Sequence, residues 1–354
     1  MTDHNPAEEI QNQIQSLEYD LKRLQSSVRL SEVRDQVEDL QTIVNGLDRR
    51  LGSLRERGYP FESELEERAA DFEKEWSQIE PELKDLIDRE ARGLERDLRP
   101  LEGDLSGLKT GNQLLSALKP RVEKVQSQME ALEGRVEAAG RSARGMYDQF
   151  HAEVRKMTTH LDDLEWMLTE LSEASFDLLA TESGIRAAKA AWARGEKQSK
   201  EDPQGVLYLT DQRLLFEQKE KVATKKILFI ATEKEQVQEL KWEVPVELIQ
   251  EIKTSDAGFL KRGDYLEMRF DSRAALDAAQ IRIWQPGEIW VSLINRAQAR
   301  EFDAGRAIPL DKDAVEQVEN APTKCSSCGG TINQPILRGM DSITCEYCGS
   351  VIRW

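Results

Sequence analysis

The feature that most constrains this chain is the placement of its cysteines. The 354-residue sequence has four, as Cys325-Ser-Ser-Cys328 and Cys345-Glu-Tyr-Cys348, with sixteen residues between the pairs. Two such pairs at this spacing match a tetrahedral Zn²⁺ site, and a reducing compartment keeps cysteines as thiols that can bind metal. Because four sulfur ligands fill the coordination sphere, the pattern predicts a structural ion. Iron held by four cysteines is the alternative to zinc.

The residues around the cysteines predict a small zinc ribbon over 324–354. In each pair the second cysteine is followed by glycine, which suits the tight turn that points both thiolates at one ion. Short segments at 331–332, 342–344 and 351–354 can form strands. A lobe of this size has too little apolar surface to fold alone, so we expect metal binding and folding to be coupled.

The ribbon's surface predicts the class of its partner. Its basic side chains are Lys324, Arg338 and Arg353, too few for the footprint of a nucleic-acid-binding module. Tyr347 and Trp354 are the candidate contact residues. We therefore expect the ribbon to contact protein, and a nucleic-acid partner is disfavoured.

Apolar residues at alternating steps of four and three predict that residues 1–183 are helical, with helices over about 7–57, 61–108 and 112–183. The first stripe slips by a step of five between Val28 and Val33, which predicts an interruption there. Pro81 and Pro100 predict kinks or restarts in the second helix. The third stripe is the most regular.

The stripes require a partner surface, and two arrangements satisfy them. The helices either fold back into a bundle within one chain or form a coiled coil with another copy, and the sequence leaves both open. A membrane-remodelling hairpin is a minority alternative, because residues 1–30 carry three basic side chains against five acidic ones. A rod or spacer that self-associates is the favoured interpretation.

The composition changes after residue 203. A polar linker is predicted over 184–203, and β-branched and aromatic residues then form seven short alternating runs. These runs are 205–210, 213–217, 225–231, 238–244, 248–252, 265–270 and 279–284. A helix opened by Pro286 follows them. The order predicts a β-barrel closed by one C-terminal helix, and the fold class is multidomain α + β.

One segment is similar to the opening hairpin of GRAM and bacterial PH-like domains. It is Gly205-Val-Leu-Tyr-Leu-Thr-Asp-Gln-Arg-Leu-Leu-Phe216. Ile249-Gln-Glu-Ile-Lys253 and Gly258-Phe-Leu-Lys-Arg-Gly263 stand where that family has its middle strand and following loop. The resemblance covers about 203–303 and places a PH-like domain at 204–303. It implies a binding module for proteins or phosphoinositides rather than an enzyme.

Lipid-binding members of that family usually carry several basic residues in the first hairpin loop. Here that loop, Thr210-Asp-Gln-Arg213, holds one cation and one acid. Two other patches are candidates for lipid or partner contact, and both combine loops with positive charge. They comprise Lys219, Lys221, Lys225 and Lys226, and Phe259, Leu260, Lys261 and Arg262.

Charge and the remaining motifs narrow the function. The net charge is −17, and residues 1–200 hold 41 acidic against 29 basic side chains, so an anionic partner must meet a local patch. A second polar linker is predicted over 304–323. No catalytic constellation is present, and the start of the sequence lacks the features of a signal peptide. We expect a cytoplasmic protein.

These patterns together predict a non-enzymatic scaffold or adaptor. Its helices extend or oligomerise, and its PH-like domain and zinc ribbon dock protein partners. The first alternative is a peripheral membrane protein directed to anionic lipid by the PH-like domain. The second is an accessory factor of the transcription or translation machinery.

Overall fold

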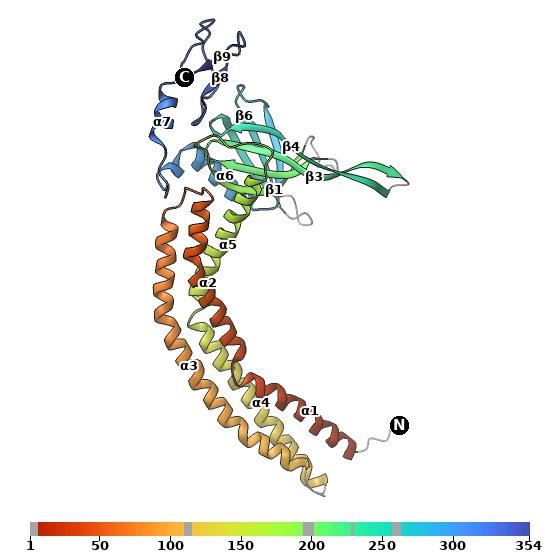
Figure 1. Ribbon diagram of the computed structural model, residues 1–354. Helices are drawn as coiled ribbons and strands as arrows, with labels where there is room; N and C mark the ends of the chain where they lie inside the picture. Colours follow the sequence, from red (N-terminus) through yellow and green to blue (C-terminus); the bar gives the residue numbers. More distant parts are fainter. Residues whose placement is uncertain (1–5, 110–114, 194–201, 228–229, 257–262) are drawn as a thin grey trace. The chain divides into compact units, whose positions relative to one another are not determined.

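The computed structural model describes residues 6–109, 115–193, 202–227, 230–256 and 263–354 (Figure 1). The chain divides into two compact units, one of residues 1–48 and 68–158 and the other of residues 49–67 and 159–354. We call the first the helical unit and the second the β unit. No helix in the described ranges carries an apolar stretch that could cross a membrane.

The helical part of the chain forms more and shorter helices than the apolar stripes predicted. The helices are α1 (Pro6–Ser27), α2 (Ser31–Glu56), α3 (Glu64–Lys109), α4 (Leu115–Gly145) and α5 (Asp148–Ser172). The predicted interruption falls between α1 and α2, where Leu30 adopts a left-handed conformation with φ of 53°. The prediction of restarts at Pro81 and Pro100 was wrong, because α3 runs through both. Leucines near both prolines, among them Leu83 and Leu98, are buried.

The third predicted helix, 112–183, is wrong in two respects. It is broken at 146–147, where Met146 and Tyr147 donate backbone hydrogen bonds three residues back, as in a 3₁₀ turn. This turn shifts the apolar stripe by one position, so Tyr147 is 3% exposed and Met146, which the stripe had placed in the seam, is 38% exposed. The helix also ends at Ser172 rather than 183, and residues 173–183 form turns and irregular structure before the first strand.

The apolar stripes of the helical unit pack against one another. Phe150 of α5 contacts Phe72 and Trp76 of α3, with ring centroids 5.7 and 5.5 Å apart. Tyr147 Oη donates to Gln36 Oε1 of α2 at 3.0 Å. The helices of the described part of this unit therefore pack against one another within the chain, and association with a second copy stays a prediction.

The β unit contains a seven-stranded antiparallel sheet in the order β4-β3-β2-β1-β7-β6-β5. The strands are β1 (Gly184–Ala193), β2 (Gln204–Thr210), β3 (Arg213–Ile227), β4 (Ile230–Pro245), β5 (Ile249–Asp256), β6 (Asp264–Phe270) and β7 (Ala278–Ile283). The short 3₁₀ helix η1 (Val246–Leu248) leads into β5, and α6 (Gly287–Gln298) follows β7.

Three sequence expectations for this sheet need correction. The predicted linker 184–203 contains β1, whose alanines are buried on both faces and therefore show no alternation of apolar and polar residues. The predicted strand 225–231 covers the end of β3 and the start of β4. Closure into a barrel is not observed, because β4 and β5 are the two outer strands of the sheet and do not pair with each other.

Aromatic side chains form the core of the sheet. Trp242 lies against Phe216, Trp192 and Phe270, with ring centroids 6.0 to 6.3 Å apart. Trp290 of α6 is fully buried and donates its indole N–H to Gln285 at 3.0 Å. The helix after the last strand thus belongs to the same core as the sheet.

The predicted flexible linker 304–323 is largely ordered. The 3₁₀ helix η2 (Glu301–Asp303) precedes it, and α7 (Lys312–Glu319) lies within it. Ser63 N–H donates to Gly305 O at 3.0 Å, and Ala307 N–H donates to Pro60 O at 2.7 Å. The linker prediction was wrong because backbone groups of this segment bond to residues 60–63 and part of it forms α7. The chain ends in the hairpin of β8 (Ser342–Thr344) and β9 (Val351–Arg353).

Candidate metal centre

Each cysteine pair lies on a turn of the same local geometry. In the first, Gly329 N–H donates to Cys325 O at 2.9 Å and Cys325 N–H donates to Gly330 O at 2.8 Å. In the second, Gly349 and Ser350 make the equivalent bonds with Cys345, both at 2.9 Å. Gly329 and Gly349 have φ of 73° and 72°, values that favour glycine. The glycines after the second cysteines are therefore required by the turn.

The two turns bring all four sulfur atoms together. The four Sγ atoms lie within 4.8 Å of one another, and the Cys325–Cys348 and Cys328–Cys345 pairs are each 3.7 Å apart. A tetrahedral ion with metal–sulfur bonds of about 2.3 Å separates its ligands by about 3.8 Å. The cysteines are free thiols rather than disulfides. The donor set and its spacing therefore fit a four-sulfur metal site.

The thiols differ in their affinity for protons. Hydrogen bonds from the side chain and backbone of Ser350 lower the pKa of Cys348 to about 6. Backbone hydrogen bonds from Cys328 and Ser327 lower the pKa of Cys325. A backbone hydrogen bond from Gly330 favours the Cys328 thiolate, but the nearby sulfur atoms raise the pKa of Cys328 to about 12. A bound dication would neutralise this crowding of negative charge and displace the remaining protons.

The ribbon lobe, residues 324–354, has a very small apolar core. Cys325, Ile343, Cys345 and Ile352 are buried in it, and Trp354 packs against them. Two of the four metal-ligand candidates are thus part of the core itself. Few other side chains are buried in this lobe, so its apolar core is small for an independently folded segment.

The two predicted ribbon contact residues differ in exposure. Tyr347 is 64% exposed, and its hydroxyl accepts a hydrogen bond from Asn333 Nδ2 at 3.3 Å. A Cβ atom at Gly330 would lie 2.6 Å from the Tyr347 ring, so the ring covers the first turn. Trp354 packs against the lobe's own core instead. Tyr347 is the better placed of the two for contact with a partner.

The first predicted lysine patch is only partly presented for binding. Lys219 Nζ lies 2.8 Å from Glu170 and 3.0 Å from Glu173, and its side chain is 20% exposed. Burial disfavours the Lys219 charge, but the hydrogen bonds to both glutamates outweigh it and raise the pKa of this lysine. Lys221 is exposed. A phosphate at Lys219 would have to compete with two carboxylates.

The rest of these patches lies outside the described residues. Lys225 and Lys226 belong to β3, but their side chains are not described. Phe259, Leu260, Lys261 and Arg262 fall in the range that the structure does not describe. Their role in lipid or partner contact stays a prediction.

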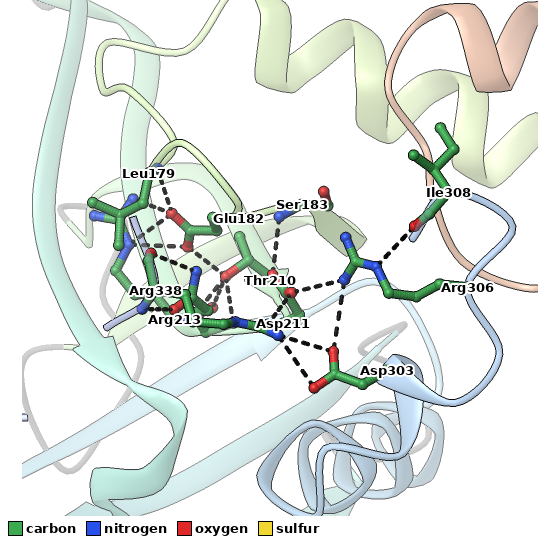
Figure 2. Close-up of polar contacts among 11 residues, drawn as sticks. Leu179, Glu182, Ser183, Thr210, Asp211, Arg213, Asp303, Arg306, Ile308 and Arg338 are labelled. Carbon is green, nitrogen blue, oxygen red and sulfur yellow. Dashed lines mark hydrogen bonds and ion pairs between the residues drawn. The ribbon is translucent and has the colours of Figure 1, made fainter. Parts of the chain in front are cut away.

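A buried charge cluster, which the sequence patterns did not predict, lies beside the ribbon lobe (Figure 2). We define it as Glu182, Asp211, Arg213, Asp303, Arg306 and Arg338. In its inner half, Arg213 Nε donates to both Glu182 oxygens at 3.0 and 3.1 Å, and Arg213 also pairs with Glu243. Thr210 Oγ1 donates to Glu182 at 2.5 Å. The Glu182 side chain is fully buried.

The outer half joins three parts of the β unit. Asp211 follows β2, Arg306 follows η2, and Arg338 belongs to the ribbon lobe. Arg338 Nη2 donates to Asp211 Oδ2 at 2.6 Å, and Arg306 Nη1 donates to the same oxygen at 3.3 Å. Arg338 Nη1 lies 3.2 Å from Asp303. The ribbon lobe is therefore held on the β unit by charge-assisted hydrogen bonds rather than being only tethered to it.

The family resemblance placed Thr210-Asp-Gln-Arg213 in the first hairpin loop, the position at which lipid-binding members carry basic residues. The structure buries all four residues, with exposures of 0, 8, 6 and 7%. Desolvation raises the pKa of Asp211, although Arg338 and Arg306 act in the opposite direction. A run of polar residues gives no periodic signal of burial, and only their long-range partners reveal it.

Comparisons with known proteins add little to this geometry. No family model matches the chain, and no curated protein matches it. Two solved structures of the DH/PH domains of p115-RhoGEF, one a point mutant, are 14% and 12% identical to the chain. They cover 84% and 82% of it and 95% and 98% of their own chains, each with a TM-score of 0.22. That score is too low to support an argument from a shared fold.

Proposed function

We propose that this protein is a non-enzymatic cytoplasmic scaffold or adaptor. The helical bundle provides length, and the β unit with its ribbon lobe docks protein partners. The observation that carries this proposal is the closed set of four cysteine sulfurs, which leaves no coordination position for a substrate. An ion there stabilises a surface instead of performing a reaction.

The proposal includes Zn²⁺ as the resident ion. Cys325, Cys328, Cys345 and Cys348 would hold it, and the ion would supply the stability that the small apolar core lacks. Zinc favours tetrahedral four-sulfur sites and has no redox chemistry. These preferences suit a structural role.

We also propose that the sheet and α6 form a PH-like module. Two observations support this: the sheet has seven antiparallel strands, six of them within or overlapping the range of the sequence resemblance, and a helix packs on the same core after the last strand. A binding module of this kind fits the scaffold role. Membrane recruitment has less support, because Lys219 is paired with Glu170 and Glu173.

The proposal is tested with the full-length chain and two variants. We expect about one Zn²⁺ per wild-type chain by elemental analysis. Tyr347→Ala should keep the metal yet lose a subset of the proteins captured by wild type, because its ring is exposed. Ser326→Ala is the matched control, since Ser326 is also exposed and lies beside a cysteine. An unchanged set of captured proteins with Tyr347→Ala would refute docking by the ribbon lobe.

A further inference from the structure

The ribbon lobe places one short peptide segment, Leu337-Arg338-Gly339, in a site built by other parts of the β unit. Arg338 N–H donates to Gln212 Oε1 at 2.6 Å, and Gln212 Nε2 donates to Arg338 O at 3.0 Å. A side-chain amide that pairs with both backbone groups of one residue holds the peptide as a neighbouring strand would. Gln212 therefore binds only the backbone of Arg338, and other residues bind the Arg338 side chain.

The side chain is read by two carboxylates (Figure 2). Arg338 Nη2 donates to Asp211 Oδ2 at 2.6 Å, and Nη1 lies 3.2 Å from each oxygen of Asp303. The Asp211 side chain is 3% exposed and the Arg338 side chain 13% exposed. A planar guanidinium can reach two carboxylates with separate N–H groups, whereas an ammonium is a single point of charge. The geometry therefore favours arginine over lysine.

The residue after the arginine is Gly339, and the site accommodates it because it has no side chain. Gly339 has φ of 85°, in the region that favours glycine. A Cβ atom there would lie 2.7 Å from Ala180 N and 3.2 Å from Thr181 N. Both the conformation and the closeness of the opposing backbone thus select glycine after arginine.

The site does not depend on the ribbon lobe for its shape. Asp211 Oδ1 accepts from Ser183 N–H at 2.9 Å, and Asp211 N–H donates to Ser183 O at 3.1 Å. The turn that carries Gln212 is fixed by Thr210 Oγ1, which accepts from Gln212 N–H and Arg213 N–H at 3.1 and 2.7 Å. A site held in this way needs little reorganisation to bind a ligand.

We infer that Asp211, Gln212, Asp303 and the backbone of Ala180 and Thr181 form a recognition site for an arginine–glycine segment of another protein. The ribbon's own Arg338 and Gly339 occupy it in this structure and so act as an internal competitor. When the ribbon lobe withdraws, Arg306 is the basic side chain among the described residues that still pairs with both carboxylates, and the unbalanced negative charge favours a new cation. The inference rests on the proposed docking role and names the partner chemistry for it.

The test uses a labelled peptide of residues 334–342 and the full-length protein. Arg338→Ala together with Gly339→Val removes the guanidinium and introduces a clash, so it should vacate the site. If the wild-type site is open in a tenth of molecules or fewer, the peptide should bind the double variant about tenfold or more tightly than wild type. Fluorescence anisotropy measures both affinities. Arg353→Ala is the control, because it changes an exposed ribbon arginine outside the site.

Two further peptides separate recognition from general charge attraction. Lysine in place of the arginine, or valine in place of the glycine, should each weaken binding to the double variant about tenfold or more. Equal binding of the lysine peptide would overturn the inference, and so would equal affinity for wild type and the double variant. Adding Asp211→Asn to the double variant should abolish the preference for arginine.

Folding and metal content are checked on the same samples. If Gly339→Val lowers the metal content, Arg338→Ala alone replaces the double variant. Failure of the peptide to bind any vacated variant that keeps wild-type circular dichroism and metal content overturns the recognition site. That result would leave the proposed scaffold role standing, because metal content and partner capture through Tyr347 are measured independently.

Discussion

The helical unit and the β unit are stabilised in different ways. The helical unit buries long stripes of apolar side chains, and no single one of them decides which surfaces meet. The β unit holds its ribbon lobe through a few buried charges, each with a specific partner. The comparison shows that the helical unit spreads its stability over many apolar contacts, whereas the ribbon lobe depends on a few specific charge pairings.

Metal removal should produce the largest difference between the units. Structural Zn²⁺ sites contribute apparent free energies of about 10–16 kcal/mol, so a chelator should unfold the ribbon lobe completely. Buried Ile343 and Ile352 should lose their protection from solvent, while the helical circular dichroism stays close to its starting value. Hydrogen exchange resolves the two regions. An ordered ribbon in protein proven to be metal-free would contradict the expectation.

Arg213→Ala should have the next largest effect. It leaves the fully buried Glu182 carboxylate without its arginine, and breaking a buried pair costs about 3–5 kcal/mol. Urea unfolding of the β unit measures the loss. Combining Arg213→Met with Glu182→Leu removes both charges and should recover at least half of it. A double variant that is less stable than the single one would show that the pairing is not the main cause.

Leu83→Ala should destabilise the helical unit by about 2–5 kcal/mol, because Leu83 is fully buried in α3. Metal content and exchange in the ribbon lobe should not change. The matched surface control is Arg141→Ala, whose ion pair with Glu137 spans 3.5 Å between exposed side chains. That control should cost less than about 1 kcal/mol. Equal losses of stability for the two substitutions in thermal unfolding would contradict the larger contribution expected of the buried leucine.

Glu62→Gln should give the smallest effect and one that depends on pH. Burial disfavours the Glu62 charge, but hydrogen bonds involving His160 and Tyr59, with the nearby Arg296 charge, lower its pKa below 4.5. Glu62 therefore stabilises the fold above that value, and the contribution is lost as pH falls through the lowered pKa. We expect a cost of about 1 kcal/mol at pH 7 that disappears in acid.

Urea unfolding at several pH values measures this difference. Glu67→Gln serves as the control because Glu67 is an exposed glutamate close in sequence, in the first turn of α3. A cost for Glu62→Gln that stays constant down to strongly acidic pH would contradict a role for the Glu62 charge. The result would then point to the shape of the side chain instead.

Patterns in the sequence predicted the features that rest on local chemistry. The cysteine spacing located the four sulfurs that converge, and the step of five between Val28 and Val33 located the break after α1. Alternating runs located most strands of the sheet. In each case the signal and the structure it specifies lie within a few residues of one another, as for the glycines that complete the metal-site turns.

Features that rest on distant partners escaped prediction. β1 is alanine-rich and buried on both faces, so neither its composition nor its periodicity distinguished it from a polar linker. The segment that contains Arg306 resembled a tether because its contacts with Asp211 and Pro60 involve distant parts of the chain. The arginine site escaped prediction for the same reason, because Gln212 and Arg338 are far apart in the sequence and come into contact only in the folded chain. Burial of charge cannot be read from one segment alone.

The backbone hydrogen bonds from Ser63 to Gly305 and from Ala307 to Pro60 bear on how the chain matures during synthesis. Phe61 is fully buried and packs against Phe302, with ring centroids 5.6 Å apart. Phe61 emerges from the ribosome long before Phe302 is synthesised. During synthesis the Phe61 ring therefore lacks its contact with Phe302 until the intervening helices and strands have emerged. A truncated product that lacks Phe302 would leave the Phe61 ring without this contact.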